Sequence, residues 1–191
     1  LINVDENGKT KLINKISEIE EHIIALDFTN DGGIAYVKGI GNGDVKDFYL
    51  TLLDSQFNKL WTKYLGKQDI SFARSNLIIT SEQNILISFY FIETAKKLTL
   101  FYFENNGNLN WQKDLINPPS SIANYKLIEL KNNTFLAATS KTLNNIDSKG
   151  DSLWFYNMNK LIYDIALSKS TNDIIVSIPR YLKVFNSSGN L

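Results

Sequence analysis

The chain has 191 residues, of which 43% are hydrophobic and 12% aromatic, a composition typical of an ordered globular protein. Twenty basic and twenty acidic side chains cancel, so no overall positive field favours nucleic acid as a partner. The absence of cysteine excludes disulfides, thiolate nucleophiles and cysteine-bound metals, and no apolar run approaches the ~20 residues of a membrane-spanning helix.

Short runs of β-branched and aromatic residues, cut at polar turns, follow one another along the chain and predict an all-β protein. Residues 11–23 also carry apolar side chains at helical spacing, but we interpret them as an outer strand, a loop and the next inner strand. From residue 22 onward the expected strands are 22–28, 34–39, 47–54, 60–65, 76–80, 84–92, 97–103, 109–115, 125–130, 134–140, 142–147, 152–158, 162–168, 173–178 and 181–185.

Five segments repeat one pattern of strand end, turn and strand start. Each has an acidic or Asn residue and a turn residue three positions later, and the first four have an aromatic residue or Leu four positions after that. The segments are 3–12, 52–61, 102–111, 145–154 and 184–191, with turn residues Gly8, Phe57, Gly107, Gly150 and Gly189. These turns recur every 39 to 50 residues, which is close to the ~40–50 residues of one blade of a β-propeller.

The residue types in the turns have a physical reason. Glycine supplies the positive φ that tight hairpins require, and the short side chains of Asp5, Asp54 and Asp147 can accept hydrogen bonds from turn amides. Phe57 departs from the glycine pattern, and we expect Asn58 to adopt the left-handed conformation in its place.

Several inner strands are apolar on both faces, as in 87–92 and 98–103, which a half-exposed antiparallel sheet would not tolerate. A blade between two neighbouring blades has both faces covered. We therefore interpret Trp61, Trp111 and Trp154 as residues that pack between blades rather than as ligand-stacking platforms.

The sequence offers few groups for catalysis or metal binding. His22 is the only histidine, and no Gly-x-Ser-x-Gly motif exists to supply a serine nucleophile. Asp27, Asp31, Asp44 and Asp47 are oxygen ligands of the kind calcium prefers, but they match no EF-hand loop. We interpret these four as solvated turn residues and assign no catalytic, metal or cofactor residue.

The repeat resembles that of secreted bacterial propellers of the quinoprotein-like (pyrroloquinoline-quinone-type) group, whose blades read approximately Asp-Gly-Gly…Gly…Asp-x-x-Gly-x-x-x-Trp-x-Lys. The matching positions are Asp31, Gly32, Gly33, Gly39, Asp54, Asn58, Trp61 and Lys63, then Glu104, Gly107, Trp111 and Lys113, then Asp147, Gly150 and Trp154. The resemblance implies four-stranded antiparallel blades and an extracytoplasmic location (periplasmic, cell-surface or secreted). The motif specifies the blade and not a chemistry.

The expected organisation is a single propeller over residues 1–191. It comprises a partial blade 1–16, blades 22–65, 72–115 and 122–158, and a partial blade 162–191. Because the chain opens with the last two strands of a blade and stops before an outer strand, we expect part of a larger ring. The alternative is a compact four-bladed ring, in which the first hairpin completes the last blade.

We expect a non-catalytic scaffold or interaction module that binds a protein or a glycan. One alternative is a quinone-dependent or glycan-processing propeller enzyme with its catalytic residues outside this segment. Another is an architectural subunit whose edge strands pair with another chain or with the rest of the propeller.

Overall fold

The structure, a computed structural model, describes residues 2–4, 10–13, 21–42, 44–69, 75–91, 97–115, 126–131 and 133–190. Every regular element in this part of the chain is a β-strand. None of the described residues forms a helix long and apolar enough to cross a membrane. Asp5, Gly8 and the stretch 14–20 lie outside the described residues.

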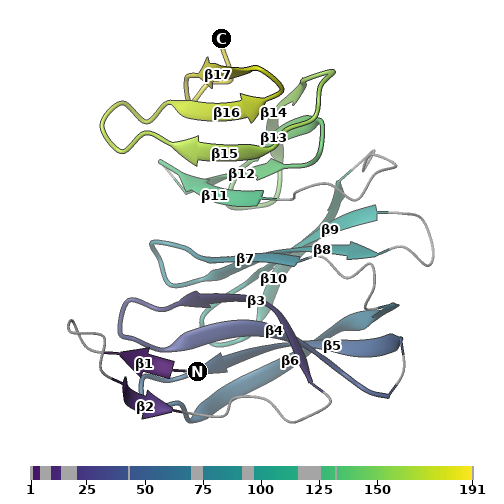
Figure 1. Ribbon diagram of the computed structural model, residues 1–191, viewed down its shortest axis with the longest axis vertical. Helices are drawn as coiled ribbons and strands as arrows, with labels where there is room; N and C mark the ends of the chain where they lie inside the picture. The colour runs from purple at the N-terminus through teal and green to yellow at the C-terminus, as the bar shows by residue number, and fades with distance from the viewer. Residues whose placement is uncertain are drawn as a thin grey trace.

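The strands form five antiparallel sheets in chain order (Figure 1). The pair β1 (Ile2–Val4) and β2 (Thr10–Ile13) comes first. Sheet I contains β3 (His22–Phe28), β4 (Ile34–Ile40), β5 (Val45–Leu53) and β6 (Lys59–Asp69). Sheet II contains β7 (Ser75–Ile79), β8 (Ile85–Phe91), β9 (Lys97–Phe103) and β10 (Leu109–Leu115). Sheet III contains β11 (Lys126–Leu130), β12 (Thr134–Ala138), β13 (Thr142–Ile146) and β14 (Ser152–Asn157), and sheet IV contains β15 (Asp164–Leu167), β16 (Ile174–Ile178) and β17 (Tyr181–Phe185).

Within each sheet the strands pair with their neighbours in sequence, so every sheet is a simple meander. The first strands of successive sheets lie side by side, β3 against β7, β7 against β11 and β11 against β15, and form a shared inner edge. The sheets stack face to face from this edge (Figure 1). The prediction of an all-β protein built from four-stranded antiparallel units is confirmed.

A separate apolar core fills each space between stacked sheets. Phe48 of sheet I meets Phe89 of sheet II, with ring centroids 5.0 Å apart. On the opposite face of sheet II, Leu100 and Tyr102 pack against Phe135 of sheet III. A third core joins sheets III and IV around Phe185. The inner strands of sheet II are therefore apolar on both faces because both faces are covered.

The hairpins lie at two opposite ends of the strands. We call one end the turn face; it carries the connections between the first and second strands of each sheet, those between the third and fourth strands of sheets I to III, and the turn that follows β17 in the three-stranded sheet IV. Its described residues are 29–33, 54–58, 80–84, 104–108, 131, 133, 147–151, 168–173 and 186–190. The opposite end, called the loop face, carries residues 41, 42, 44, 139–141, 158–163 and 179–180 among those that the structure describes. In Figure 1 the hairpins joining β3 to β4, β7 to β8 and β15 to β16 extend to the left.

The three tryptophans connect neighbouring sheets through the turn face. Each indole is half-buried, starts from the fourth strand of one sheet, and donates its Nε1–H to a backbone carbonyl in the turn that follows the third strand of the next sheet. The donor–acceptor pairs are Trp61 with Asn105 at 2.8 Å, Trp111 with Ser148 at 2.8 Å, and Trp154 with Ser187 at 3.2 Å. The same contact thus holds sheet I to sheet II, sheet II to sheet III, and sheet III to sheet IV.

The indole rings also explain the glycines in the same turns. A Cβ atom added to Gly107, Gly150 or Gly189 would lie 2.9, 3.0 or 2.8 Å from a carbon of the facing indole, closer than van der Waals contact allows. All three glycines also have a positive φ, between 82° and 86°. Glycine is required here for two independent reasons, the backbone conformation and the space that the ring occupies.

Phe57 occupies the corresponding turn position in sheet I and corrects one expectation. The residue with positive φ is Phe57 itself (65°), whereas Asn58 was expected to adopt that conformation. The Phe57 side chain packs with Ile34, Tyr36 and Leu53 on the face of sheet I that points away from sheet II. This burial offsets the cost of a left-handed backbone in a residue with a Cβ.

Substitution of the turn glycines separates the two reasons. Gly107→Ala places a methyl group against Trp61, whereas Gly32→Ala has the same type of backbone (φ 88°) but its Cβ meets Ser55 only at 3.7 Å. We expect Gly32→Ala to lower the free energy of unfolding by about 1–2 kcal/mol. Gly107→Ala should cost about 1–3 kcal/mol more, since the ring must move. Urea denaturation measures both, and equal losses would contradict the contact.

Truncation of the central indole tests the connection between sheets. Trp111 stacks on Tyr102, with centroids 5.4 Å apart, and is partly buried. We expect Trp111→Ala to lower the free energy of unfolding by about 3–5 kcal/mol. Trp111→Phe keeps a ring over Gly150 and loses only the N–H donor, so it should cost about 1 kcal/mol. An Ala variant with an unchanged denaturation midpoint would contradict this role.

Candidate functional site

The hairpins of the turn face are held by their own polar side chains. Asp54 Oδ1 accepts from the backbone N–H of Gln56 at 2.9 Å and of Asn58 at 2.8 Å. Asp147 and Asn186 accept the two corresponding amide hydrogens in their own turns, at 2.8–3.0 Å. Since Asn186 does this without a charge, the turn needs the acceptor oxygen at this position and not the carboxylate.

The turn face is strongly acidic over sheets I and II. Its four hairpins there contain Asp31, Asp54, Glu82 and Glu104 and no lysine or arginine. The described hairpins of sheets III and IV instead contain three acidic and three basic residues, which are Lys131, Asp147, Lys149, Asp151, Lys169 and Asp173. The hairpins that contain acidic residues and no cation of their own are therefore those of the first two sheets, where Lys63 of β6 lies against Gly107.

A cavity of about 240 Å³ opens in this acidic region, between sheets I and II. Its lining residues are Thr29, Asn30, Asp31, Leu52, Leu53, Asp54, Leu60, Gln83 and Asn105. The backbone N–H of Asn30 donates to Gln83 Oε1 at 2.9 Å, which ties the two walls together. Two carboxylates, three side-chain amides and three leucines thus line one small cavity.

Both carboxylates of this cavity are stabilised as anions. The hydroxyl of Thr29 donates to Asp31 Oδ1 at 2.5 Å, and the backbone N–H of Gly33 donates to the same oxygen. Both hydrogen bonds lower the pKa of Asp31. The side-chain amide of Asn58 donates to Asp54 Oδ2 at 3.0 Å. This hydrogen bond and the one from the backbone N–H of Asn58 lower the pKa of Asp54, while the negative charge of Asp31 opposes the shift. The cavity therefore carries two negative charges at neutral pH.

A second cavity, of about 330 Å³, lies at the equivalent position between sheets II and III. Its lining residues are Glu82, Asn84, Tyr102, Asn110, Trp111, Ser148 and Lys149. Lys149 balances Glu82, and the Tyr102 hydroxyl accepts from the Asn84 side-chain amide at 3.0 Å. Burial raises the pKa of Tyr102, so its phenol stays neutral. The geometry repeats from cleft to cleft, but only the first cavity has two negative charges and no positive one.

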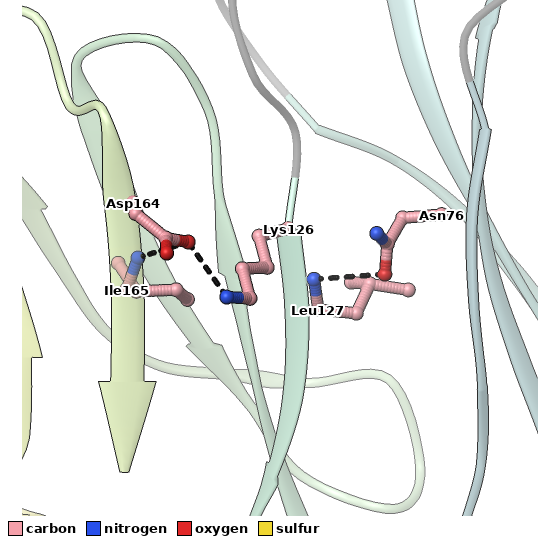
Figure 2. A network of polar contacts seen from close by, with 5 residues as sticks. All are labelled: Asn76, Lys126, Leu127, Asp164 and Ile165. Atoms are coloured by element: carbon pink, nitrogen blue, oxygen red, sulfur yellow. Dashed lines mark hydrogen bonds and ion pairs between the residues drawn. The ribbon is translucent and has the colours of Figure 1, made fainter.

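Polar side chains also bridge the inner strands. Asn76 Oδ1 of β7 accepts from the backbone N–H of Leu127 in β11 at 3.2 Å, and Lys126 Nζ lies 2.6 Å from Asp164 Oδ1 of β15 (Figure 2). The Lys126 ammonium lowers the pKa of Asp164. These contacts join neighbouring inner strands, β7 to β11 and β11 to β15.

Asp27 belongs to the same inner network and corrects its interpretation as a solvated turn residue. Its Oδ2 accepts from the backbone N–H of Ile79 in β7 at 2.8 Å, and its Oδ1 accepts from Phe28 N–H at 2.9 Å. Oδ2 therefore joins sheet I to sheet II, while Oδ1 is held within β3 of sheet I.

The other candidate ligands do not converge. His22 is the exposed first residue of β3, Asp44 is exposed in the loop between β4 and β5, and Asp47 accepts from the Tyr64 hydroxyl at 3.1 Å. Asp31 lies on the turn face, at the other end of the strands from Asp44. Within the described part of the chain, no group of three or more His, Cys, Asp or Glu residues is placed to hold a metal ion.

Sequence reasoning missed most of the first cavity. Asn30 and Gln83 occupy first-to-second-strand hairpins of adjacent sheets, and Leu60 follows the turn that Asp54 caps. The sequence alignment of the repeats used only the tryptophan turns. If the first-to-second-strand hairpins had been aligned as well, residues 30 and 83 would have been predicted to lie in one cleft. The leucines carried no such signal, since apolar residues are expected throughout the strands.

Comparison with known proteins identifies the fold. No protein-family model and no curated protein matches the sequence. The structure is similar to BamB from Moraxella catarrhalis (TM-score 0.59, 16% identity, 88% of this chain and 51% of that one). It is also similar to BBS1N solved in complex with ARL6DN (TM-score 0.62, 13% identity, 96% and 58%) and to a gluconolactonase from Xanthomonas campestris (TM-score 0.59, 12% identity, 95% and 63%).

These similarities establish a β-propeller fold, and BamB is a propeller of the quinoprotein-like type, so the resemblance expected from the repeat is confirmed for the fold. The chain spans 51–63% of the length of these three solved structures. A binding protein and an enzyme both occur among them, so the fold alone does not select a function.

The inner-strand network allows a stability test. Asp27→Ala leaves the Ile79 N–H without its acceptor, and we expect the free energy of unfolding to fall by about 1–3 kcal/mol. Lys126→Ala breaks an ion pair that is open to solvent, so its cost should stay below about 1 kcal/mol. Chemical denaturation of both variants measures the difference. A larger loss from Lys126→Ala than from Asp27→Ala would contradict this assignment.

Proposed function

We propose that the chain is a non-catalytic propeller module that binds a basic segment of a protein partner through the turn face of sheets I and II. The observation that carries this proposal is the first cavity, where Asp31 and Asp54 stand beside the leucines of β5 and β6.

The cavity suits one long cationic side chain. Lysine and arginine combine an apolar stem with a charged head, and the stem packs on leucine while the head reaches the carboxylates. The half-exposed Leu60 and the carboxylates of Asp31 and Asp54 are placed for these two parts. At about 240 Å³ the cavity is smaller than the ~300–1,000 Å³ of most small-molecule sites.

The surrounding face favours the same partner. Glu82 and Glu104 extend the negative potential beyond the cavity, which raises the association rate of a basic segment. The tryptophan contacts fix the hairpins relative to one another, so little ordering is needed on binding. BBS1N, which has a similar fold, was solved as a complex with another protein.

The repeat pattern also bears on where the module acts. The resemblance of the repeat to secreted bacterial propellers supports an extracytoplasmic location for the module.

A charge-matched pair of variants tests the cavity. Asp31→Asn/Asp54→Asn keeps the acceptor oxygens that hold the turns, as Asn186 does naturally, and removes two charges. We expect it to weaken binding of a synthetic lysine-rich peptide about tenfold, since each exposed charge interaction contributes up to about 1 kcal/mol. Titration calorimetry measures the affinity.

The control variant is Asp147→Asn/Asp151→Asn, which removes two charges from the turn face of sheet III. It should change the peptide affinity less than about twofold. Equal weakening by both double variants would show that only the total charge matters and would contradict the site, as would no effect from either.

The pH dependence follows from the same carboxylates. Because their pKa values lie below the ordinary 3.8, both remain ionised as the pH falls from 7 to 5. Peptide binding should therefore persist across that range and disappear only as the pH falls below 3.8, when the carboxylates take up protons. Loss of binding between pH 6 and 5 would contradict the role of these two groups.

A further inference from the structure

Cations and tyrosine rings gather on the loop face between sheets III and IV. Lys160 Nζ lies 3.0 Å from the Tyr181 hydroxyl and 4.8 Å from the centroid of its ring. Lys183 Nζ lies 5.5 Å from the ring centroid of Tyr156. Together with Arg180, which precedes Tyr181, these residues form what we call the cation–tyrosine cluster.

The backbone at Arg180 is unusual. Pro179 and Arg180 form the two-residue turn between β16 and β17, and Arg180 has a φ of 79°. Proline followed by a residue of positive φ is the pattern of a type II turn, in which glycine normally takes the second position. Arg180 therefore presents a long cationic side chain at a turn position that glycine would occupy without strain.

The cluster has no acidic counterpart in its own loops. The loop-face segments 139–141, 158–163 and 179–180 contain Lys141, Lys160 and Arg180 and no acidic residue. Asp164, the first residue of β15, is engaged by Lys126. The ammonium of Lys160, with a smaller contribution from Lys183, lowers the pKa of Tyr181.

The ring of Tyr181 is accessible beside these charges. Its exposed fraction is 46%, and Lys160 and Arg180 are also exposed. An acidic sugar combines an anionic group with a ring whose C–H bonds pack on an aromatic surface. The cluster provides a cationic donor for the first and an aromatic surface for the second.

We propose that the cation–tyrosine cluster binds an anionic saccharide, with a uronate or sulfate group held by Lys160 and Arg180 and a sugar ring packed on Tyr181. The site lies on the face opposite the acidic cavity and uses none of its residues. A failure of the peptide-binding proposal would therefore leave this one intact.

Calorimetry with defined saccharides tests the proposal on the 191-residue protein. Polygalacturonate fragments and dextran sulfate distinguish uronate from sulfate, and neutral dextran and poly-glutamate are the comparisons. We expect at least one anionic saccharide to bind, with no binding of dextran and weaker binding of poly-glutamate. Equal binding of dextran, or tighter binding of poly-glutamate than of either saccharide, would overturn the proposal.

Variants then locate the site. Lys160→Ala/Arg180→Gly should weaken saccharide binding at least about tenfold and raise the melting temperature, since glycine relieves the positive φ. Lys131→Ala/Lys169→Ala removes the same charge from exposed positions on the turn face and should change affinity less than about twofold. Equal effects of the two double variants would overturn the site.

The ring requires its own test, which also serves if the double variant fails to fold. Tyr181→Ala should weaken saccharide binding several-fold, whereas Tyr64→Ala, at a 57% exposed tyrosine of β6, should not. Lys160→Gln should weaken binding while keeping the size of the side chain. Unchanged affinity in both Tyr181→Ala and Lys160→Gln would overturn the proposal.

Discussion

The arrangement of the whole molecule depends on one contact, an indole of one sheet placed over the turn glycine of the next sheet with its N–H bonded to a carbonyl of the same turn. The contact occurs three times with nearly the same geometry, from Trp61, Trp111 and Trp154. Because it joins the fourth strand of one sheet to a hairpin of the next, it fixes both the spacing and the alignment of the sheets. The cavities of the turn face follow from this alignment, since each lies between hairpins that the indoles hold at a constant distance.

A neutral composition conceals an uneven distribution of charge. Twenty acidic and twenty basic residues give no net charge, yet the turn face of sheets I and II is acidic and the loop face between sheets III and IV is basic. Two surfaces of opposite sign thus lie at opposite ends of the strands. The total charge, which argued against nucleic acid as a partner, gave no indication of these local fields. They become visible only when the charged residues are assigned to the turn face or the loop face.

The strand pattern and the repeat could be predicted because they depend on local periodicity and on turn chemistry. The packing of a neighbouring sheet on each face of the inner strands could also be predicted, since strands that are apolar on both faces require two neighbours. The individual contacts between the sheets could not be predicted. Asp27 was expected to be a solvated turn residue, but its partner Ile79 is 52 residues away, a separation that local patterns do not register. The positive φ of Phe57 depends on the burial of its ring, and Asp5 and Gly8 remain predictions outside the described residues.

The most direct test of this account is amide-type hydrogen exchange at the three indole Nε1–H groups, which give three separate signals in a nitrogen-15 spectrum because the chain has only three tryptophans. If each indole is bonded to the neighbouring sheet, all three hydrogens should exchange far more slowly than in a free indole, and that of Trp111, between two complete sheets, should exchange only on global unfolding. Exchange of all three at the rate of free indole would contradict the claim that these contacts hold the sheets together.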